Sequence, residues 1–245
     1  MVSKTVIIAA IAAGIVVAGV AAAFAVSSGM APATDKPAAT QNAERITTQL
    51  MSPSVAGAPA LGSDDARVTI VEFGDYQCTW CYRWHEGTKD TLVAEYVDTG
   101  KVRFLFKDFP INDLADRASS LAAEASYCAA DQGKYWEYHD KVYDTADEVM
   151  KSDPRGIENT GWVTRTSLEQ MADDAGVPDM AAFSDCLDSG KYTGVVSDNY
   201  DLARTVGLKA TPSFIVLTDG ETPKLIEGAH PYSTFERVID EAYSG

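Results

Sequence analysis

The sequence has few positively charged residues for its length. Lys and Arg total 20 among 245 residues, whereas Asp and Glu total 36, and the formal net charge is −16. A protein with this balance repels a polyanion instead of attracting it. The composition therefore argues against nucleic-acid binding and indicates a solvated acidic surface.

Cysteine and histidine are also scarce, with four and three residues. Four cysteines are too few for a cysteine-stapled fold of this length. The content of 46% hydrophobic and 23% charged residues is that of an ordinary globular protein and excludes a disordered or collagen-like chain. We therefore expect one elaborated domain.

The N-terminal residues contain a long apolar run. The 22 residues from Thr5 to Val26 carry no charge, which is enough for a helix to cross a hydrocarbon core of roughly 30 Å. We interpret residues 1–26 as a transmembrane anchor; the alternative is a cleaved secretory signal, whose apolar core is usually shorter. Because Lys4 precedes the run, both interpretations place the rest of the chain outside the cytoplasm, in the periplasm or at the cell surface. Disulfides persist in such a compartment.

Residues 27–62 are rich in Ser, Ala, Pro and Thr, which predicts a flexible linker. Its one apolar spacing is a weak helical turn around Ile46 and Leu50. We therefore expect the folded domain at residues 63–245, held away from the membrane by the linker.

The folded part mixes strand and helix patterns. A helical pattern runs from Cys78 to about Asp98, and residues from about 113 to 206 are helical throughout. Four short runs have strand-like patterns: 68–73, 101–106, 213–217 and 224–227. The first two enclose the first helix as a β-α-β unit. This order predicts an α/β domain with an all-helical insertion at about residues 113–206.

Cys78 and Cys81 lie at the predicted start of the first helix. A thiolate attacks disulfides, and the unpaired N–H groups and dipole at a helix N-terminus stabilise a thiolate. Cys78 is then the exposed nucleophile and Cys81 the buried resolving thiol. The alternative is half of a structural zinc site, which needs two more ligands from Cys128, Cys186 and three isolated histidines. We expect no metal.

Two further positions support a redox site. Glu72 lies on an otherwise apolar strand, where a buried carboxylate needs a partner or a proton. We expect Glu72 to accept the proton of Cys81 during resolution; the alternative is a strand-end carboxylate in contact with water. Thr211 and Pro212 precede the third strand. Proline cannot donate a hydrogen bond to a central ladder, so we expect Pro212 at the first residue of this strand. A cis bond there would expose backbone groups to a peptide substrate.

Segments around the cysteines (60–62, 68–73 and 78–81), in the helical region (133–140) and at the third strand (210–214) together resemble the DsbA-like thiol:disulfide oxidoreductases. The resemblance covers about residues 60–245. It implies a thioredoxin fold with a helical insertion, a Cys78–Cys81 disulfide that cycles with substrates, a cis bond before Pro212 and an acid at Glu72. The family often has Pro at the position of Thr79 and an aromatic residue or His at the position of Trp80, and this dipeptide tunes the redox potential.

Cys128 and Cys186 fall on two helices of the insertion. In an exported protein a bridge is more expected than two free thiols, and pairing Cys78 with Cys81 leaves Cys128 to pair with Cys186. Some DsbA-like proteins carry such a second bridge; the alternative is two packed free thiols. We predict a structural disulfide.

We expect substrates to bind a rim formed by Tyr76, Thr79, Trp80, Thr211 and Pro212. Alternatively, Trp80 only covers the start of the helix. His139 shares a helical face with apolar residues and is expected in the core, whereas His85 is expected at the surface.

The sequence thus predicts an exported, membrane-tethered thiol:disulfide oxidoreductase, more an oxidase than a reductase, acting on reduced or misoxidised exported proteins. We expect no cofactor, and a membrane redox partner of the DsbB or vitamin-K-epoxide-reductase-like type. The alternatives are a thioredoxin-like reductase serving an extracytoplasmic client and a non-enzymatic anchored binding module. The helix start favours the Cys78 thiolate and the acidic domain disfavours it, so we expect a pKa of roughly 5 to 6.

Overall fold

The computed structural model describes residues 38–244. The predicted anchor at residues 1–26 therefore lies outside the described residues. Within residues 38–244 no helix has both the length and the apolar character needed to cross a membrane.

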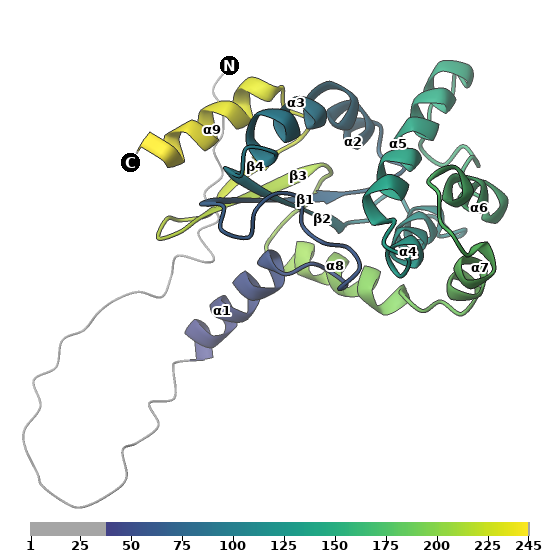
Figure 1. The fold of residues 1–245 in the computed structure, drawn as a ribbon, viewed down its shortest axis with the longest axis horizontal. Helices are drawn as coiled ribbons and strands as arrows, with labels where there is room; N and C mark the ends of the chain where they lie inside the picture. The colour runs from purple at the N-terminus through teal and green to yellow at the C-terminus, as the bar shows by residue number, and fades with distance from the viewer. Residues whose placement is uncertain (1–37, 245) are drawn as a thin grey trace, which may run out of the picture.

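The centre of the molecule is a sheet of four strands in the order β2-β1-β3-β4 (Figure 1). The strands are β1 (Val68–Gly74), β2 (Val102–Asp108), β3 (Ser213–Thr218) and β4 (Lys224–Glu227). β1 pairs with β2 in parallel and with β3 antiparallel, and β3 pairs antiparallel with β4. All seven residues of β1 are buried, as its apolar pattern predicts for a central strand. The four predicted strands are confirmed.

The helix after β1 runs without a break from residue 79 to residue 97. It consists of α2 (Thr79–Trp84) and α3 (Asp90–Leu92), each followed by a π-helical turn, at His85–Lys89 and Val93–Val97. We refer to it as the 79–97 helix. It ends before Gly100, which has a φ of +76° and so adopts the left-handed conformation that glycine tolerates best.

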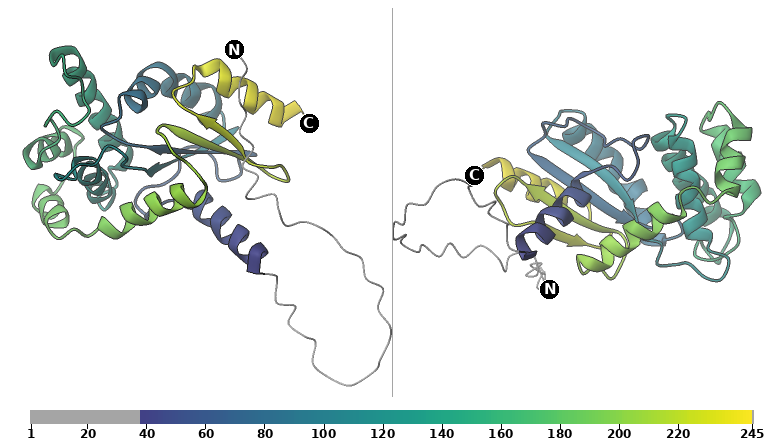
Figure 2. Two further views of the ribbon diagram at one scale, coloured as in Figure 1. Left: turned by 180° about the vertical axis from the view of Figure 1, so that it is seen from behind. Right: turned by 90° about the horizontal axis from the view of Figure 1, so that it is seen from below.

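Helices cover both faces of the sheet (Figures 1 and 2). The 79–97 helix and α9 (Tyr232–Ser244) lie on one face, where Trp84, Phe214 and Phe235 share a buried cluster. On the other face, α1 (Ala38–Met51) and α8 (Thr193–Thr205) bury their apolar side chains against β1, β2 and β3.

The helical insertion lies beyond one end of the sheet (Figure 1). Before the chain returns to the sheet through α8, it forms α4 (Ala118–Ala130), α5 (Tyr135–Ser152), α6 (Arg165–Asp174) and α7 (Met180–Asp188). These four helices pack around a second hydrophobic cluster, which also contains Cys78, Cys81 and Phe106 of β2. The predicted α/β domain with an all-helical insertion is therefore confirmed, but α8, which the predicted range of about 113–206 includes, packs against the sheet.

The prediction of a flexible linker at residues 27–62 is wrong for residues 38–62. Residues 38–51 form α1, whose Ile46 and Leu50 are buried in the cluster that contains Val71 and Leu105. Leu61 then exchanges backbone hydrogen bonds with Phe104 of β2, both at 2.9 Å. Two apolar residues four positions apart give a weak local pattern, but the apolar face of the sheet stabilises the helix that covers it.

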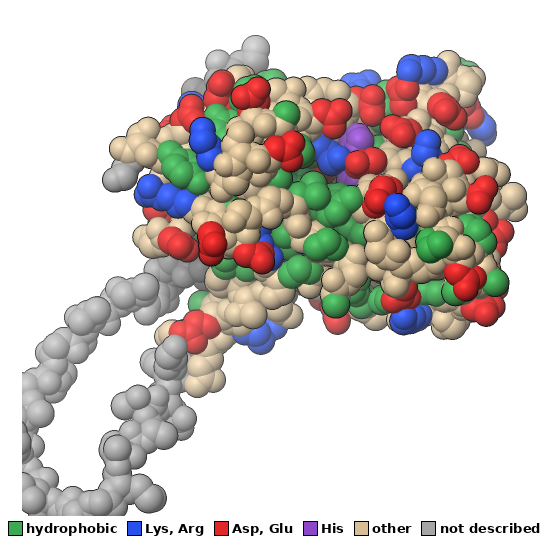
Figure 3. Space-filling model, in the orientation of Figure 1, with side chains coloured by type: hydrophobic (Ala, Val, Ile, Leu, Met, Phe, Trp, Pro, Cys, Tyr) green, Lys and Arg blue, Asp and Glu red, His purple; other side chains and the backbone are tan. Residues whose placement is uncertain are grey.

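Charged side chains are spread over the surface. On the face shown in Figure 3, acidic side chains are scattered around a central group of hydrophobic side chains. This agrees with the predicted solvated acidic surface.

Candidate active site

The turn after β1 places Cys78 at the start of the 79–97 helix. Cys78 is the N-cap residue of α2, with φ −81° and ψ 120°. The side chain of Asp75 accepts a hydrogen bond from Gln77 N at 2.8 Å, and Asp75 O accepts one from Cys78 N at 2.9 Å. A Cβ at Gly74 would lie 2.4 Å from the Phe106 ring, so only glycine fits at this point of the turn.

The two thiols are free and differ in their surroundings. The Cys78 thiol donates to Thr211 O at 3.5 Å, and Cys78 is 5% exposed. The expected exposure of Cys78 is therefore wrong, because the loop before β3 covers its sulfur. Cys81 lies deeper, with no exposed surface, and its sulfur accepts from Asp75 N at 3.5 Å.

The difference in environment separates the two thiols in acidity. A hydrogen bond from the Cys81 thiol lowers the pKa of Cys78 to about 7, although burial opposes this shift. Burial raises the pKa of Cys81 well above its ordinary value. A pKa of about 7 is higher than the expected 5 to 6. At neutral pH Cys78 is nevertheless the thiol with substantial thiolate, as the nucleophile of a dithiol must be.

Glu72 lies on β1 beneath the cysteines and is 2% exposed. Burial raises its pKa to about 8, and the positive charge of Lys89 acts in the opposite direction. The alternative of a carboxylate in contact with water is therefore excluded. An acid of this pKa exchanges a proton readily near neutral pH.

Asp75 is a buried carboxyl beside the cysteines that the sequence pattern does not single out. Its side chain accepts from Gln77 N and from Asn112 N, both at 2.8 Å. Burial raises its pKa to about 6, and these backbone hydrogen bonds oppose the shift. An Asp in a turn signals local backbone bonding, but only the folded chain shows that its charge lies near the dithiol.

The predicted rim is present in part, because Trp80 and Thr79 reach the surface whereas Thr211 and Pro212 are buried beside the Cys78 sulfur. The Thr211–Pro212 bond is cis, and Thr211 O faces the Cys78 sulfur. Trp80 is 54% exposed, with the Arg83 guanidinium 4.7 Å from its ring centre, and Thr79 is partly exposed.

Tyr76 does not belong to this rim, contrary to the prediction. It is 1% exposed, and its ring lies 5.5 Å from the Tyr143 ring and 5.4 Å from the Phe106 ring. The backbone turn directs Tyr76 into the core shared with the helical insertion, where its aromatic ring removes more apolar surface from water than at the rim.

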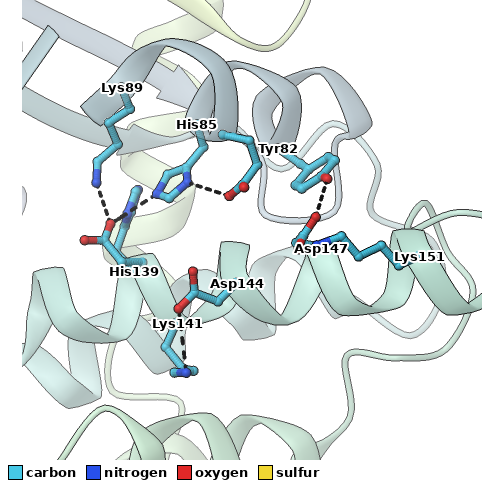
Figure 4. Close-up of polar contacts among 10 residues, drawn as sticks. Tyr82, His85, Lys89, His139, Lys141, Asp144, Asp147 and Lys151 are labelled. Atoms are coloured by element: carbon cyan, nitrogen blue, oxygen red, sulfur yellow. Dashed lines mark hydrogen bonds and ion pairs between the residues drawn. The ribbon is translucent and has the colours of Figure 1, made fainter. Parts of the chain in front are cut away.

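A polar cluster joins the 79–97 helix to α5 (Figure 4). Lys89 Nζ donates to Asp140 Oδ1 at 2.6 Å, and His85 Nε2 and His139 Nδ1 lie 3.2 and 3.1 Å from the same oxygen. Burial works against the charge of Asp140, but the hydrogen bonds from both histidines and the charge of Lys89 hold its pKa well below its usual range.

The predicted position is correct for one histidine of this cluster and wrong for the other. His139 is in the core as predicted, and burial lowers its pKa to about 4, so it is neutral at pH 7. The surface position expected for His85 is wrong, because it packs against Tyr143 with ring centres 4.5 Å apart. Nitrogen and oxygen atoms of His85, His139 and Asp140 lie within 4.8 Å of one another, a metal-like grouping, but the Lys89 ammonium already contacts the shared oxygen.

Cys128 of α4 and Cys186 of α7 form a disulfide, as predicted. The bridge links two helices of the insertion across 58 residues of sequence. Because both sulfurs are in this bond, neither supplies a thiolate to a zinc site with Cys78 and Cys81.

These observations define the class of protein. A sheet of this order, a dithiol at the start of the first helix and a cis-proline facing it form a thioredoxin fold, which here carries a helical insertion. The model of the thioredoxin family matches residues 54–241, and the chain belongs to this family. Within it, the chain is a DsbA-like thiol:disulfide oxidoreductase.

Known relatives support this assignment. The chain is 26% identical to disulfide bond formation protein D of Bacillus subtilis (strain 168) over 193 residues. This alignment covers 79% of this chain and 80% of the relative. It is 31% identical over 159 residues to probable disulfide bond formation protein D of Bacillus anthracis, covering 64% and 68%. The crystal structure of oxidised BdbD from Bacillus subtilis matches with a TM-score of 0.65 and 27% identity over 79% of this chain and 96% of that one.

Proposed function

We propose that the chain introduces disulfide bonds into exported proteins through Cys78 and Cys81. A substrate thiolate attacks the Cys78 sulfur of the oxidised pair, and the Cys78–Cys81 bond breaks with Cys81 as the leaving group. A second substrate thiolate then attacks the substrate sulfur of the mixed disulfide and releases the Cys78 thiolate. The substrate loses two electrons to the dithiol.

The contrast between the two thiols supports this assignment of roles. Cys78 is the outer sulfur, faces Thr211 O beside the cis-proline and has the lower pKa. Cys81 is fully buried, and its raised pKa makes its thiolate a poor leaving group unless it receives a proton. We propose that Glu72, with a pKa of about 8, gives that proton and takes it back when Cys81 reacts again.

We propose that Thr79, Trp80, Thr211 and Pro212 hold the substrate. The exposed Trp80 ring supplies an apolar contact, and the loop with the cis bond places Thr211 O beside the Cys78 sulfur that the substrate attacks. Such contacts are weakly selective, which suits an enzyme that acts on many unfolded chains.

The chain acts outside the cytoplasm in this proposal. Two features support the location: the uncharged run at residues 5–26 and the Cys128–Cys186 disulfide, which persists in oxidising compartments. Two electrons must leave the dithiol after each turnover, and a membrane redox partner of the DsbB or vitamin-K-epoxide-reductase-like type would accept them. Retention of the full chain in carbonate-washed membranes tests the anchor, and a mature chain that starts near residue 26 or 34 indicates a cleaved signal.

Trapping of mixed disulfides tests the roles of the cysteines. We expect Cys81→Ser to accumulate covalent adducts at Cys78 with unfolded proteins that contain a disulfide, because the Cys78 thiolate attacks that disulfide, one substrate sulfur leaves as a thiol, and no resolving thiol then releases the other. The matched change Cys78→Ser is expected to trap almost none. Equal yields of adduct from the two variants contradict the assignment.

A thioredoxin-like reductase is the second candidate, and one observation favours it. A pKa of about 7 for Cys78 equals the value of about 7 known for thioredoxin, whereas DsbA has a value of about 3.5. We expect a reduction potential of roughly −220 to −180 mV, which is still oxidising toward unfolded thiols. Equilibration with glutathione measures it, and a value below about −250 mV supports the reductase instead.

A further inference from the structure

A carboxylate from the helical insertion contacts the start of the 79–97 helix. Oε1 of Glu158 accepts a hydrogen bond from the backbone N–H of Thr79 at 3.1 Å. Thr79 follows Cys78 and is the first residue of α2. The N–H groups of a first helical turn have no partner within the helix and stabilise a nearby thiolate. Glu158 occupies one of these donors and adds a negative charge beside it.

The loop that carries Glu158 is held in place on both sides of this residue. Ile157 is fully buried, and its carbonyl oxygen accepts from Trp162 Nε1 at 2.7 Å. Thr160 Oγ1 donates to Gly156 O at 2.8 Å. These contacts fix the backbone around Glu158 between α5 and α6, so its approach to Thr79 is part of the tertiary structure.

We propose that Glu158 is a positioning residue that restrains the Cys78 thiolate and thereby weakens the protein as an oxidant. It acts through Thr79 N–H and through its own charge, without contacting the sulfur. This inference rests on the proposed role of Cys78 as the nucleophile. It assigns to the helical insertion a direct influence on the chemistry of the dithiol.

Several other groups surround Cys78. Glu72 and Asp75 approach from the strand and the turn, and burial raises their pKa values to about 8 and 6. Thr211 O faces the sulfur from the loop before β3, and Arg83 is stacked on Trp80. Unlike the two buried acids, Glu158 is exposed. The effect of its charge is therefore reduced by solvent and salt.

The test compares Glu158→Gln and Glu158→Ala in the full chain. Gln keeps an acceptor for Thr79 N–H but removes the charge, and Ala removes both. We expect the Cys78 pKa, measured by thiolate absorbance, to fall in both variants, giving about three- to tenfold more thiolate at a pH below it. The equilibrium with glutathione shifts by a similar factor toward the reduced protein, and a tenfold shift corresponds to about 30 mV.

The matched control is Glu148→Gln, which removes the same charge from an exposed position on α5. We expect it to leave the Cys78 pKa unchanged. At about 1 M salt the difference between the wild type and Glu158→Gln is expected to shrink, because the Debye length falls to about 3 Å.

Three results overturn the proposal. One is an unchanged or raised Cys78 pKa in Glu158→Gln with a normal thermal unfolding curve. Another is an equal shift in the Glu148→Gln control. The third is a raised pKa in Glu158→Ala, which would show that Glu158 only caps the helix. Failure of Cys81→Ser to trap adducts at Cys78 contradicts the proposed function and is independent of the results with the Glu158 variants.

Discussion

The two cysteine pairs of this chain border the same hydrophobic cluster but differ in their other neighbours. Cys78 and Cys81 are three residues apart at the start of a helix, with buried carboxyl groups below them and a peptide loop above. Cys128 and Cys186 are 58 residues apart and join two helices within a hydrophobic cluster. The first pair also has the buried carboxyl groups of Glu72 and Asp75 beside it, which can exchange protons with its thiols as reversible exchange requires. The difference shows that the surroundings, not the sulfur, decide whether a pair cycles or holds the fold together.

The largest expected effect concerns the bridge in the insertion. We expect Cys128→Ala with Cys186→Ala to lower the free energy of unfolding by about 4 kcal/mol, because the bridge closes a long loop of the unfolded chain. The exchange activity of the folded variant should persist. Urea unfolding in mild dithiothreitol measures the loss. The matched double change of Cys78 and Cys81 to Ala should cost at most about 1 kcal/mol there and abolish exchange. Similar losses of stability from the two pairs would contradict the comparison.

The next effect concerns Glu72, whose carboxyl group lies near Cys81 of the first pair. Its pKa is raised from 4.5 to about 8, so the folded protein binds a proton more tightly than the unfolded chain does. The stability of the wild type should therefore fall as the pH rises from about 4.5 to 8.

Replacing Glu72 with Gln removes this dependence. We expect Glu72→Gln to be more stable than the wild type at pH 7 by on the order of 3 kcal/mol, while its rate of thiol exchange falls by about tenfold or more. Urea unfolding of the reduced proteins at pH 5 and pH 8 gives the slope. A wild-type stability that rises over this range would show that the Glu72 pKa is not raised.

The smallest effect is a difference in rates at constant structure. After brief exposure to mild dithiothreitol, alkylation should label Cys78 and Cys81 first and leave Cys128 and Cys186 protected, because Cys78, with its lowered pKa, is a good leaving thiolate in exchange. Mass spectrometry of the labelled peptides measures the order. Free thiols at positions 128 and 186 in untreated protein would show that Cys128 and Cys186 do not form a disulfide.

Local sequence patterns were sufficient for most of the architecture. The strands have β-branched or alternating residues, and the 79–97 helix lies between Cys78 and Gly100. Pro212 directly precedes the first residue of β3. The residues of each of these elements therefore predict it locally. The linker prediction failed at α1 because its helical signal consists of two residues. Only the apolar face of the sheet, formed by residues far along the chain, stabilises that helix.

By itself the sequence determined the dithiol at a helix start, an acid on the neighbouring strand and a proline at the strand that faces them. These depend on spacings of a few residues, which backbone geometry converts directly into position. The tertiary structure decided which groups surround the sulfur atoms. It turned Tyr76 into the core, buried His85 against α5, set Asp75 beside Cys81 and brought Glu158 to Thr79 across 79 residues of sequence. A contact of that separation leaves no periodic pattern in the chain, because it arises when separately folded elements pack together.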